Sequence, residues 1–145
     1  MTISFLLWLA TILPQPAADQ VCLATTVYLE ARSESQVGQM AVAEVAMRRR
    51  EHGRWGNTVC DVVRAPGQFA LTTTNPRYAL RNPRAWAAAW AVAGHAIHMW
   101  SLPIDRRRLV VPDADHFVLA ESTTPAWIKG AAATTIGAHN FYHIN

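Results

Sequence analysis

The sequence predicts an α+β fold that is mostly helical, with a small antiparallel β-sheet or hairpin near the C-terminus. Apolar residues recur at helical spacing along most of the first hundred residues, whereas the remainder consists of short alternating runs typical of strands. The chain has 145 residues, which is the length of one domain. Its hydrophobic content of 51% and its six tryptophans predict a packed core and exclude a disordered protein.

The chain begins with a near-apolar run over residues 3–13. As a helix this run would cover roughly 16 Å, about half the thickness of a bilayer core. Two prolines follow it, and Ala17 and Ala18 offer a small-residue cleavage site, so residues 1–18 are expected to be a secretory signal peptide. No Lys or Arg precedes the run. An uncleaved signal-anchor segment and an N-terminal core helix of a cytosolic protein therefore stay open.

Two cysteines, Cys22 and Cys60, fit an exported protein, because oxidising compartments permit a disulfide. A bridge between them would contribute roughly 3 to 4 kcal/mol in the chain-entropy model. Two buried thiols explain the same residues equally well. The sequence contains no CxxC motif, so it gives no support to redox chemistry or to a structural zinc site.

The next two segments predict a pair of helices joined at a corner. Asp19 can cap a helix over residues 19–32, whose apolar face is formed by Val21, Ala24, Val27, Tyr28 and Ala31. Ser33 and Gln36 form a capping-box pattern ahead of a second helix over residues 35–51. The apolar stripe of this second helix is Val37, Met40, Ala41 and Val45.

The rest of the chain predicts two more helices and several strands. Asn57 or Thr58 can begin a short helix to about residue 64, and a Pro-rich irregular stretch follows. Asn82 caps a helix to about residue 100 with Pro83 in its first turn, and its stripe of Trp86, Trp90, Ala93 and Ile97 is interpreted as core. The runs "RLVVPD", "DHFVLAE" and "TIGAHNFYHI" then predict strands.

The formal net charge is +3 and the pI is about 9.3. Basic residues cluster in "MRRR" (residues 47–50) and "DRRR" (residues 105–108), and both runs are interpreted as solvated helix ends. The charge argues weakly for an anionic partner. The sequence shows no dense basic stripe and no nucleic-acid-binding motif, so no nucleic-acid partner is expected.

Glu30 lies near the end of the first of the two paired helices. A carboxyl group there feels the negative end of the helix dipole, and apolar neighbours such as Val27 and Tyr28 also disfavour its ionised form. Both effects raise its pKa, and a protonated carboxyl group can donate a proton to a leaving glycosidic oxygen. The alternative is a helix-end Glu paired with Arg32 or Arg49.

Seven sequence blocks resemble, in order and spacing, the SleB-type cell-wall hydrolase family, which includes spore-cortex-lytic enzymes and some phage endolysins. They are "YLEARSE", "GQMAVAEVAMRR", "NTVCDVV", "APGQF", "ADHF", "PAWI" and "TIGAHNFY". The resemblance runs from about Val21 to Tyr142, and it implies that residues 19–145 form a catalytic domain with a lysozyme-like, α-rich fold. The chain departs from the family at Ser33, Glu44 and Arg48.

The resemblance also implies a function. Family members look like lytic transglycosylases that cut the bond between N-acetylmuramic acid and N-acetylglucosamine in peptidoglycan, without a cofactor. The Glu of the family's "EAR" motif is the general acid and matches Glu30. By the same correspondence, the residues lining the glycan cleft would be Gln68, Phe69, His116, Trp127 and His139.

The number of acids bears on the mechanism. A hydrolytic muramidase normally needs a second carboxylate across the scissile bond, and the spacing singles out none of the candidates Glu34, Asp61, Asp113, Asp115 and Glu121. A lytic transglycosylase needs only Glu30, because the C6 hydroxyl of the muramic sugar replaces water. Transglycosylation is therefore favoured, with hydrolysis as the alternative.

Two other functions compete with this one. Six histidines, among them His95, His98, His139 and His143, prompt a zinc-dependent amidase, although HExxH is absent. A glycan-binding module would keep the aromatic residues and need no Glu30. The expected protein is a monomer acting on peptidoglycan in the periplasm or outside the cell, from a phage or a bacterium. It would touch a membrane only through an uncleaved N-terminal segment.

Overall fold

The computed structural model describes residues 1–123, 125–128 and 134–144. Within these residues, helices form the first two thirds of the chain and a three-stranded sheet follows. The α-helices are α1 (Ile3–Ile12), α2 (Gln15–Ala31), α3 (Gln36–His52), α4 (Val59–Arg64), α5 (Ala70–Thr73) and α6 (Pro83–Ser101). The strands are β1 (His116–Leu119), β2 (Thr134–Ile136) and β3 (His139–Tyr142), and two short 3₁₀ turns lie at Ile104–Arg106 and Ala126–Ile128.

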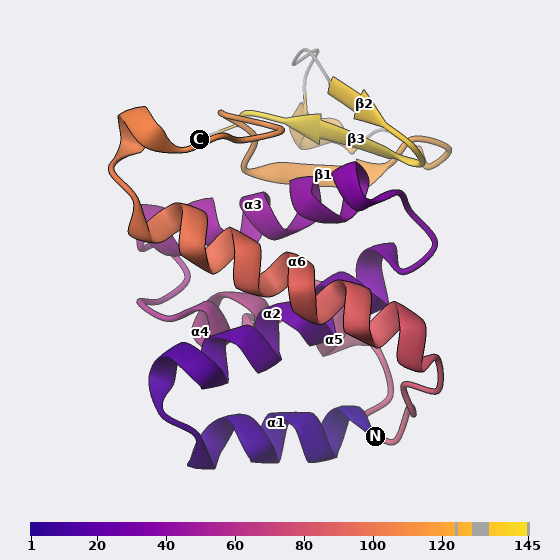
Figure 1. Cartoon of the computed structure of the whole chain (residues 1–145). Coiled ribbons are helices and arrows are strands. Elements are labelled where there is room, and N and C mark those ends of the chain that lie inside the picture. The colour runs from indigo at the N-terminus through magenta and orange to yellow at the C-terminus, as the bar shows by residue number, and fades with distance from the viewer. Residues whose placement is uncertain (124, 129–133, 145) are drawn as a thin grey trace.

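The sheet and α1 lie at opposite ends of the molecule, with α2 and α6 between them (Figure 1). The sheet packs beside α3. Its central strand β3 pairs antiparallel with both β1 and β2, and Phe117 of β1 lies opposite Phe141 of β3. The predicted α+β fold, mostly helical with a small antiparallel sheet near the C-terminus, is confirmed.

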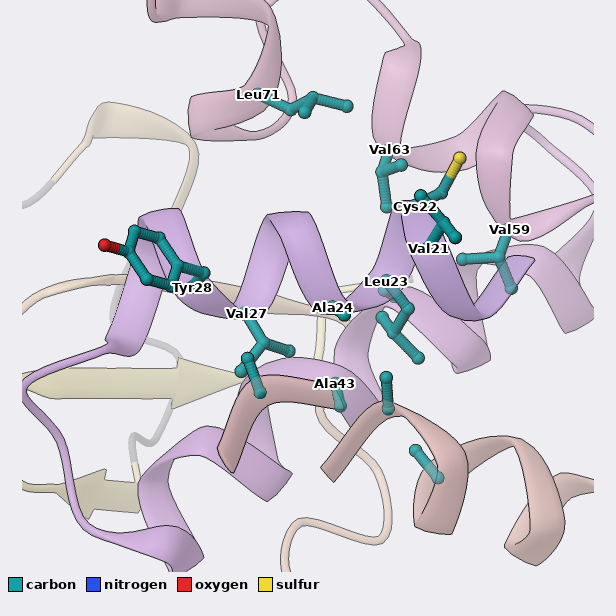
Figure 2. Packing of buried hydrophobic residues seen from close by; sticks show 14 of the residues in the cluster. Val21, Cys22, Leu23, Ala24, Val27, Tyr28, Ala43, Val59, Val63 and Leu71 are labelled. Atoms are coloured by element: carbon teal, nitrogen blue, oxygen red, sulfur yellow. The ribbon is translucent and has the colours of Figure 1, made fainter. Parts of the chain in front are cut away.

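Helix α2 is the centre of the core and is buried on nearly all sides. Val63 and Leu71 approach it from one side and Ala43 from the opposite side (Figure 2). Its two buried threonines satisfy their hydroxyls within the helix, because Thr25 donates to the Val21 carbonyl and Thr26 to the Cys22 carbonyl. The predicted apolar face of this helix is buried as expected, and the neighbouring faces are buried too.

The start of α2 differs from the prediction. The helix begins at Gln15 rather than Asp19, after Pro14, which has no donor of its own to satisfy. Asp19 lies inside the helix, and its Oδ1 accepts a hydrogen bond of 3.2 Å from the backbone N–H of Cys60 in the first turn of α4. A disulfide joins Cys60 to Cys22. Helix α4 is thus tied to α2 by a covalent bond and a carboxylate.

The start of α3 also differs from the prediction. The capping side chain is Ser35, which accepts from the N–H of Gly38, and the predicted box of Ser33 with Gln36 is wrong. Val37 was assigned to the apolar stripe but is 53% exposed. Further along, the structure confirms the caps predicted for the later helices, Thr58 for α4 and Asn82 for α6.

The stripe predicted for α6 is displaced around the helix. Trp90 is 38% exposed and Trp86 is only partly buried, so the two tryptophans lie at the edge of the core rather than inside it. The side chains that α6 buries against α2 and α3 are mostly small, and they are Ala89, Val92, Ala93, Ala96 and Trp100. Small residues let α6 approach α2 closely.

The segment predicted as a first strand, residues 108–113, is not a strand. Its backbone N–H groups at Val110 and Val111 donate instead to Glu44 of α3, at 2.9 and 2.8 Å. Glu44 is only 1% exposed, and burial raises its pKa even though these two hydrogen bonds oppose the shift. A buried carboxylate therefore supplies the acceptors that a neighbouring strand would have supplied.

The basic run at residues 47–50 was interpreted as a solvated helix end, and this is wrong for Arg48 and Arg49, which are buried. Arg48 donates to the carbonyl of Ala114, and Arg49 Nε donates to the carbonyl of Asp115 at 2.8 Å. Together with Glu44, these two arginines fasten the segment between α6 and β1 to α3.

Helix α1 packs on α2 and buries Ile3 and Leu6 in the main core. Its N-terminal end pairs with the stretch before α6, because the N–H of Ile3 donates to Tyr78 and the N–H of Leu80 donates to Met1. Among the described residues, no helix combines the length and the apolar character that crossing a bilayer requires. In the structure, then, the first eighteen residues are part of the fold.

We expect Glu44→Ala to lower the free energy of unfolding by roughly 2 to 4 kcal/mol, because it leaves two buried N–H groups without an acceptor. Glu44→Gln keeps one acceptor oxygen and should cost less. Urea denaturation measures both. The matched control is Glu51→Ala on the same helix, which removes an exposed carboxylate that pairs with Arg107. Equal losses for Glu44→Ala and Glu51→Ala would contradict the role of Glu44.

Candidate active site

A cleft of about 530 Å³ opens between the C-terminal end of α3, the loop before α5, and strand β1. Its wall combines cations, amide and imidazole groups with aromatic rings. The lining residues are Arg49, Arg54, Trp55, Gly67, Gln68, His116, Phe117, Val118, Trp127 and Ile144. Polar groups placed among aromatic rings suit a ligand that has both hydroxyls and apolar faces.

The structure brings three of the five predicted cleft residues, Gln68, His116 and Trp127, to the wall of this cleft. The other two lie elsewhere. Phe69 is a core residue, 3% exposed. His139 is buried against the ring of Phe117, with a distance of 5.3 Å between ring centroids. These two side chains support the wall from behind.

The ring of His116 stands between two tryptophans. Its centroid is 5.0 Å from Trp127 and 6.4 Å from Trp55, whose ring is nearly perpendicular to it. His116 Nδ1 lies 2.7 Å from Asp115 Oδ1, and a carboxylate only accepts, so Nδ1 carries the hydrogen. Burial lowers the pKa of His116, although the bond to Asp115 opposes the shift. The ring is therefore neutral around pH 7, with Nε2 as an acceptor.

Glu30 lies in the last turn of α2, next to the cleft wall rather than in its lining. Its Oε1 accepts a hydrogen bond of 2.7 Å from the N–H of Ala70, two residues after Gln68. Burial raises the pKa of Glu30, while the bond from Ala70 and the charge of Arg49 oppose the shift. Within the described part of the chain Oε2 accepts no hydrogen bond, so this oxygen can carry the transferable proton.

Arg49 connects Glu30 with the cleft. The sequence analysis named it only as a possible partner of Glu30 and did not place it in the cleft. Its Nη1 lies 3.4 Å from Gln68 Oε1, and its guanidinium lies over the rings of Trp55 and Phe69, 5.0 and 4.8 Å from their centroids. Burial lowers the pKa of Arg49 to about 10, which leaves it charged at neutral pH. The missed signal was its spacing, seven and four residues along from the buried positions 42 and 45.

The alternative interpretation of Glu30 was a helix-end carboxylate paired with Arg32 or Arg49. Within the described residues, no ion pair joins it to Arg32 or to Arg49 at 4 Å or less. Arg32 instead places its guanidinium 5.3 Å from the ring centroid of Tyr28. Glu30 therefore combines partial burial, one fixed amide donor and a more distant positive charge.

The other candidate carboxylates have different surroundings. Three accept backbone N–H groups: Glu34 from Ala138, Asp61 from Thr58, and Asp115 from Ile144. The remaining two, Asp113 and Glu121, are exposed. Each of the first three holds a backbone N–H group in place, which gives it a structural role.

The histidines that prompted a zinc site are dispersed over the molecule. His95 and His98 lie on α6, whereas His139 belongs to β3 and His143 follows it. Within the part of the chain that the structure describes, no group of three or more His, Cys, Asp or Glu residues is arranged to hold a metal ion.

Comparison with known proteins bears on the same residues. The model of the cell wall hydrolase family matches residues 33–142. This range contains every cleft-lining residue except Ile144, and it begins three residues after Glu30. No curated protein matches the chain.

Two solved structures are similar over most of the chain. The catalytic domain of the Bacillus cereus SleB protein has a TM-score of 0.65 and 28% identity, covering 86% of this chain and 88% of that one. The catalytic domain of the germination-specific lytic transglycosylase SleB from Bacillus anthracis has a TM-score of 0.64 and 28% identity, covering 86% and 93%. The family match spans far more than half of the sequence, and the chain belongs to the cell wall hydrolase family.

Proposed function

We propose that this protein is a lytic transglycosylase that cleaves peptidoglycan between N-acetylmuramic acid and N-acetylglucosamine, with Glu30 as general acid and then general base. The observation that carries the proposal is the Glu30 carboxyl group, whose pKa is raised by burial and which lies beside an aromatic cleft. Membership of the cell wall hydrolase family supports glycan cleavage, and the likeness to a protein named as a lytic transglycosylase supports the finer reaction.

In the first step the protonated Glu30 donates its proton to the glycosidic oxygen. The bond between that oxygen and C1 of the muramic sugar breaks, and the N-acetylglucosamine side leaves with a new hydroxyl. Positive charge develops on the muramic ring, and Glu30 becomes a carboxylate. The hydrogen bond from Ala70 to Oε1 stabilises this carboxylate and leaves Oε2 as the atom that exchanges the proton.

In the second step the C6 hydroxyl of the same muramic sugar attacks C1. Its proton passes to the Glu30 carboxylate, which restores the acid, and the product carries a 1,6-anhydro ring. The nucleophile is already attached to the reacting sugar, so its effective concentration is high and a second carboxylate is not needed to activate water. The structural roles of Glu34, Asp61 and Asp115 support this one-acid scheme.

The cleft wall suits a chain of sugar rings. Trp127 is 46% exposed and stands beside His116, so it can stack on the apolar face of a sugar. His116 Nε2 and the Gln68 amide can bind sugar hydroxyls and acetamido groups. Arg49 aligns Gln68 through its guanidinium. Residues 19–145 carry this machinery.

Peptidoglycan lies outside the cytoplasmic membrane, so the proposal includes export to the periplasm or the cell exterior. The disulfide between Cys22 and Cys60 supports export, because such bonds persist in oxidising compartments. A phage endolysin and a bacterial wall-remodelling enzyme both meet these requirements. The protein is proposed to act as a monomer.

Product analysis tests the reaction class. Mass spectrometry of fragments released from purified cell walls should find 1,6-anhydromuramic ends that resist borohydride reduction, because the cyclised sugar has no free aldehyde. Reducible muramic ends would show hydrolysis and would require a second carboxylate. Free stem peptides with intact glycan strands would contradict the proposal in favour of an amidase.

Glu30→Gln should reduce wall cleavage by at least about 100-fold, because it removes the transferable proton and keeps an acceptor for the Ala70 N–H. The matched control is Glu34→Gln, at the corner between α2 and α3, which keeps an acceptor for Ala138 and should cost far less. Circular dichroism checks that both variants fold. Equal activity losses in the two variants would contradict the role of Glu30.

The raised pKa of Glu30 predicts that cleavage activity and stability both decline as pH rises. Cleavage should persist above pH 4.5, the ordinary value for Glu, and decline as pH rises through the raised pKa. Stability contributed by the protonated group is complete below pH 4.5 and is lost over the same rise. The melting temperature of Glu30→Gln relative to that of the unaltered protein should therefore rise as pH is raised above 4.5 through the folded-state pKa. A difference in melting temperature that does not change with pH would contradict the shift.

A further inference from the structure

The side of α1 that faces away from α2 exposes three large apolar side chains. Phe5, Trp8 and Ile12 are 44%, 55% and 60% exposed, and the rings of Phe5 and Trp8 lie 5.9 Å apart. Their spacing of three and four residues places them on one side of the helix. Phe5, Trp8 and Ile12 together are called the α1 face below.

The α1 face continues into an apolar hollow of about 440 Å³ between α1 and α6, lined by Met1, Leu6, Leu9, Leu13, Val21, Trp86, Ala87 and Trp90. Leu9 follows Phe5 by four residues and precedes Ile12 by three, so the hollow adjoins the exposed row. Trp86 and Trp90 contact each other on the α6 side, with ring centroids 6.1 Å apart. Contiguous apolar surface with several aromatic residues marks an interaction site.

Positive charge borders this surface. Residues 1–18 contain no ionisable side chain, and the sequence contains no Asp or Glu between residues 61 and 105. Arg77, Arg81 and Arg84 are exposed in this stretch. The backbone places Arg77 and Arg81 close to α1, because the N–H groups of Ile3 and Ser4 donate to the carbonyls of residues 78 and 76, and the N–H of Leu80 donates to the carbonyl of Met1. Arg84 lies two residues before Trp86, which lines the hollow.

We propose that the α1 face docks the protein on an anionic lipid bilayer, with α1 kept as a folded helix lying in the plane of the membrane surface. Aromatic and aliphatic side chains would enter the boundary between headgroups and acyl chains, and the three arginines would bind lipid phosphates. Stable surface binding usually needs two such contributions together. At 10 residues, α1 is far too short to cross the bilayer.

Charge also argues against the other obvious occupant, a second copy of this chain. A symmetric contact through the same face would bring the arginines of both copies together with no acidic partner from that part of the sequence. An anionic bilayer instead matches the apolar surface and the charge beside it.

The docked orientation leaves the cleft open. The residues that line the hollow do not occur in the cleft lining, and the sheet that forms one cleft wall lies at the end of the molecule opposite α1 (Figure 1). The inference goes beyond glycan cleavage and does not depend on it. It requires only that residues 1–18 stay attached, as the burial of Ile3 and Leu6 favours.

Vesicle flotation of the full chain tests the proposal. The protein should float with vesicles of phosphatidylcholine and phosphatidylglycerol at least about tenfold more than with phosphatidylcholine alone, since each arginine near the surface contributes about fivefold. The double variant Phe5→Ser and Trp8→Ser should bind the anionic vesicles at least about tenfold more weakly. Arg84→Gln should lose about fivefold.

Matched controls lie at the far end of α6. Ile104→Ser removes an apolar side chain that is 73% exposed, and Arg108→Gln removes an exposed charge outside the docking region. Neither should change flotation. Thermal melting and circular dichroism establish that each variant is folded.

Four results would overturn the proposal. The first is that the folded protein does not float with anionic vesicles, and the second is that it floats equally well when Phe5 and Trp8 are replaced. The third is the formation of dimers in sedimentation analysis that disappear in the double variant, without binding vesicles, which would assign the face to a second copy. The fourth is an intact mass of exported protein that shows a chain starting near Asp19 and lacking α1. Wall cleavage by the enzyme could persist in all four cases, so these outcomes do not test Glu30.

Discussion

The buried guanidinium of Arg49 is the interaction on which the active-site region depends. It donates one hydrogen bond to the carbonyl of Asp115, just before β1, and a second to the side-chain oxygen of Gln68, before α5. Its flat faces lie against Trp55 and Phe69. One planar group thus joins the helical part of the molecule to the sheet, and its charge limits how far burial can raise the pKa of Glu30. Lysine has neither the planar surface nor the directed donors to replace it.

Two departures from the family pattern, Glu44 and Arg48, form a structural unit of their own. They are four residues apart on α3, and both bind the segment that leads from α6 to β1. Glu44 binds its amides and Arg48 a carbonyl, so the segment is held by both kinds of backbone group. The departures left the electrostatic partners of Glu30 uncertain in the sequence. Of the charges on α3, it is Arg49 that acts on Glu30.

Local signals predicted the helices well, because a cap or an apolar repeat is contained within a few neighbouring residues. The limits of α4 and α6 follow from Thr58, Asn82 and Pro83 in this way. Errors arose where a distant residue supplied the partner. Asp19 accepts a hydrogen bond from Cys60, about forty residues further on, in α4. Glu44 binds the backbone of residues 108–113, which were expected to pair as a strand. Short-range rules do not contain such contacts.

The candidate site shows the same division. Glu30 was chosen because its position at a helix end and the "EAR" motif agree, and the structure places its carboxyl group beside the cleft. Arg49, Arg54 and Trp55 were not predicted as cleft residues, since a basic run at the end of a helix usually faces solvent. Phe69 and His139 resembled cleft residues in their motifs, but their burial depends on Phe117 and on the packing of the sheet.

The bridge between α2 and α4 makes the redox state of the surroundings part of the maturation of this molecule. It closes a separation of 38 residues, and the reduced chain would lack roughly 4 kcal/mol of stabilisation. Thiols are kept reduced where proteins are synthesised and become oxidised after export. A reduced chain would keep the hydrogen bond from the Cys60 N–H to Asp19 and the apolar packing of α4 on α2, but not the covalent bond between them. Oxidation would thus add the covalent cross-link between α2 and α4, so the stability of the fold depends on the redox state of the compartment that holds the chain.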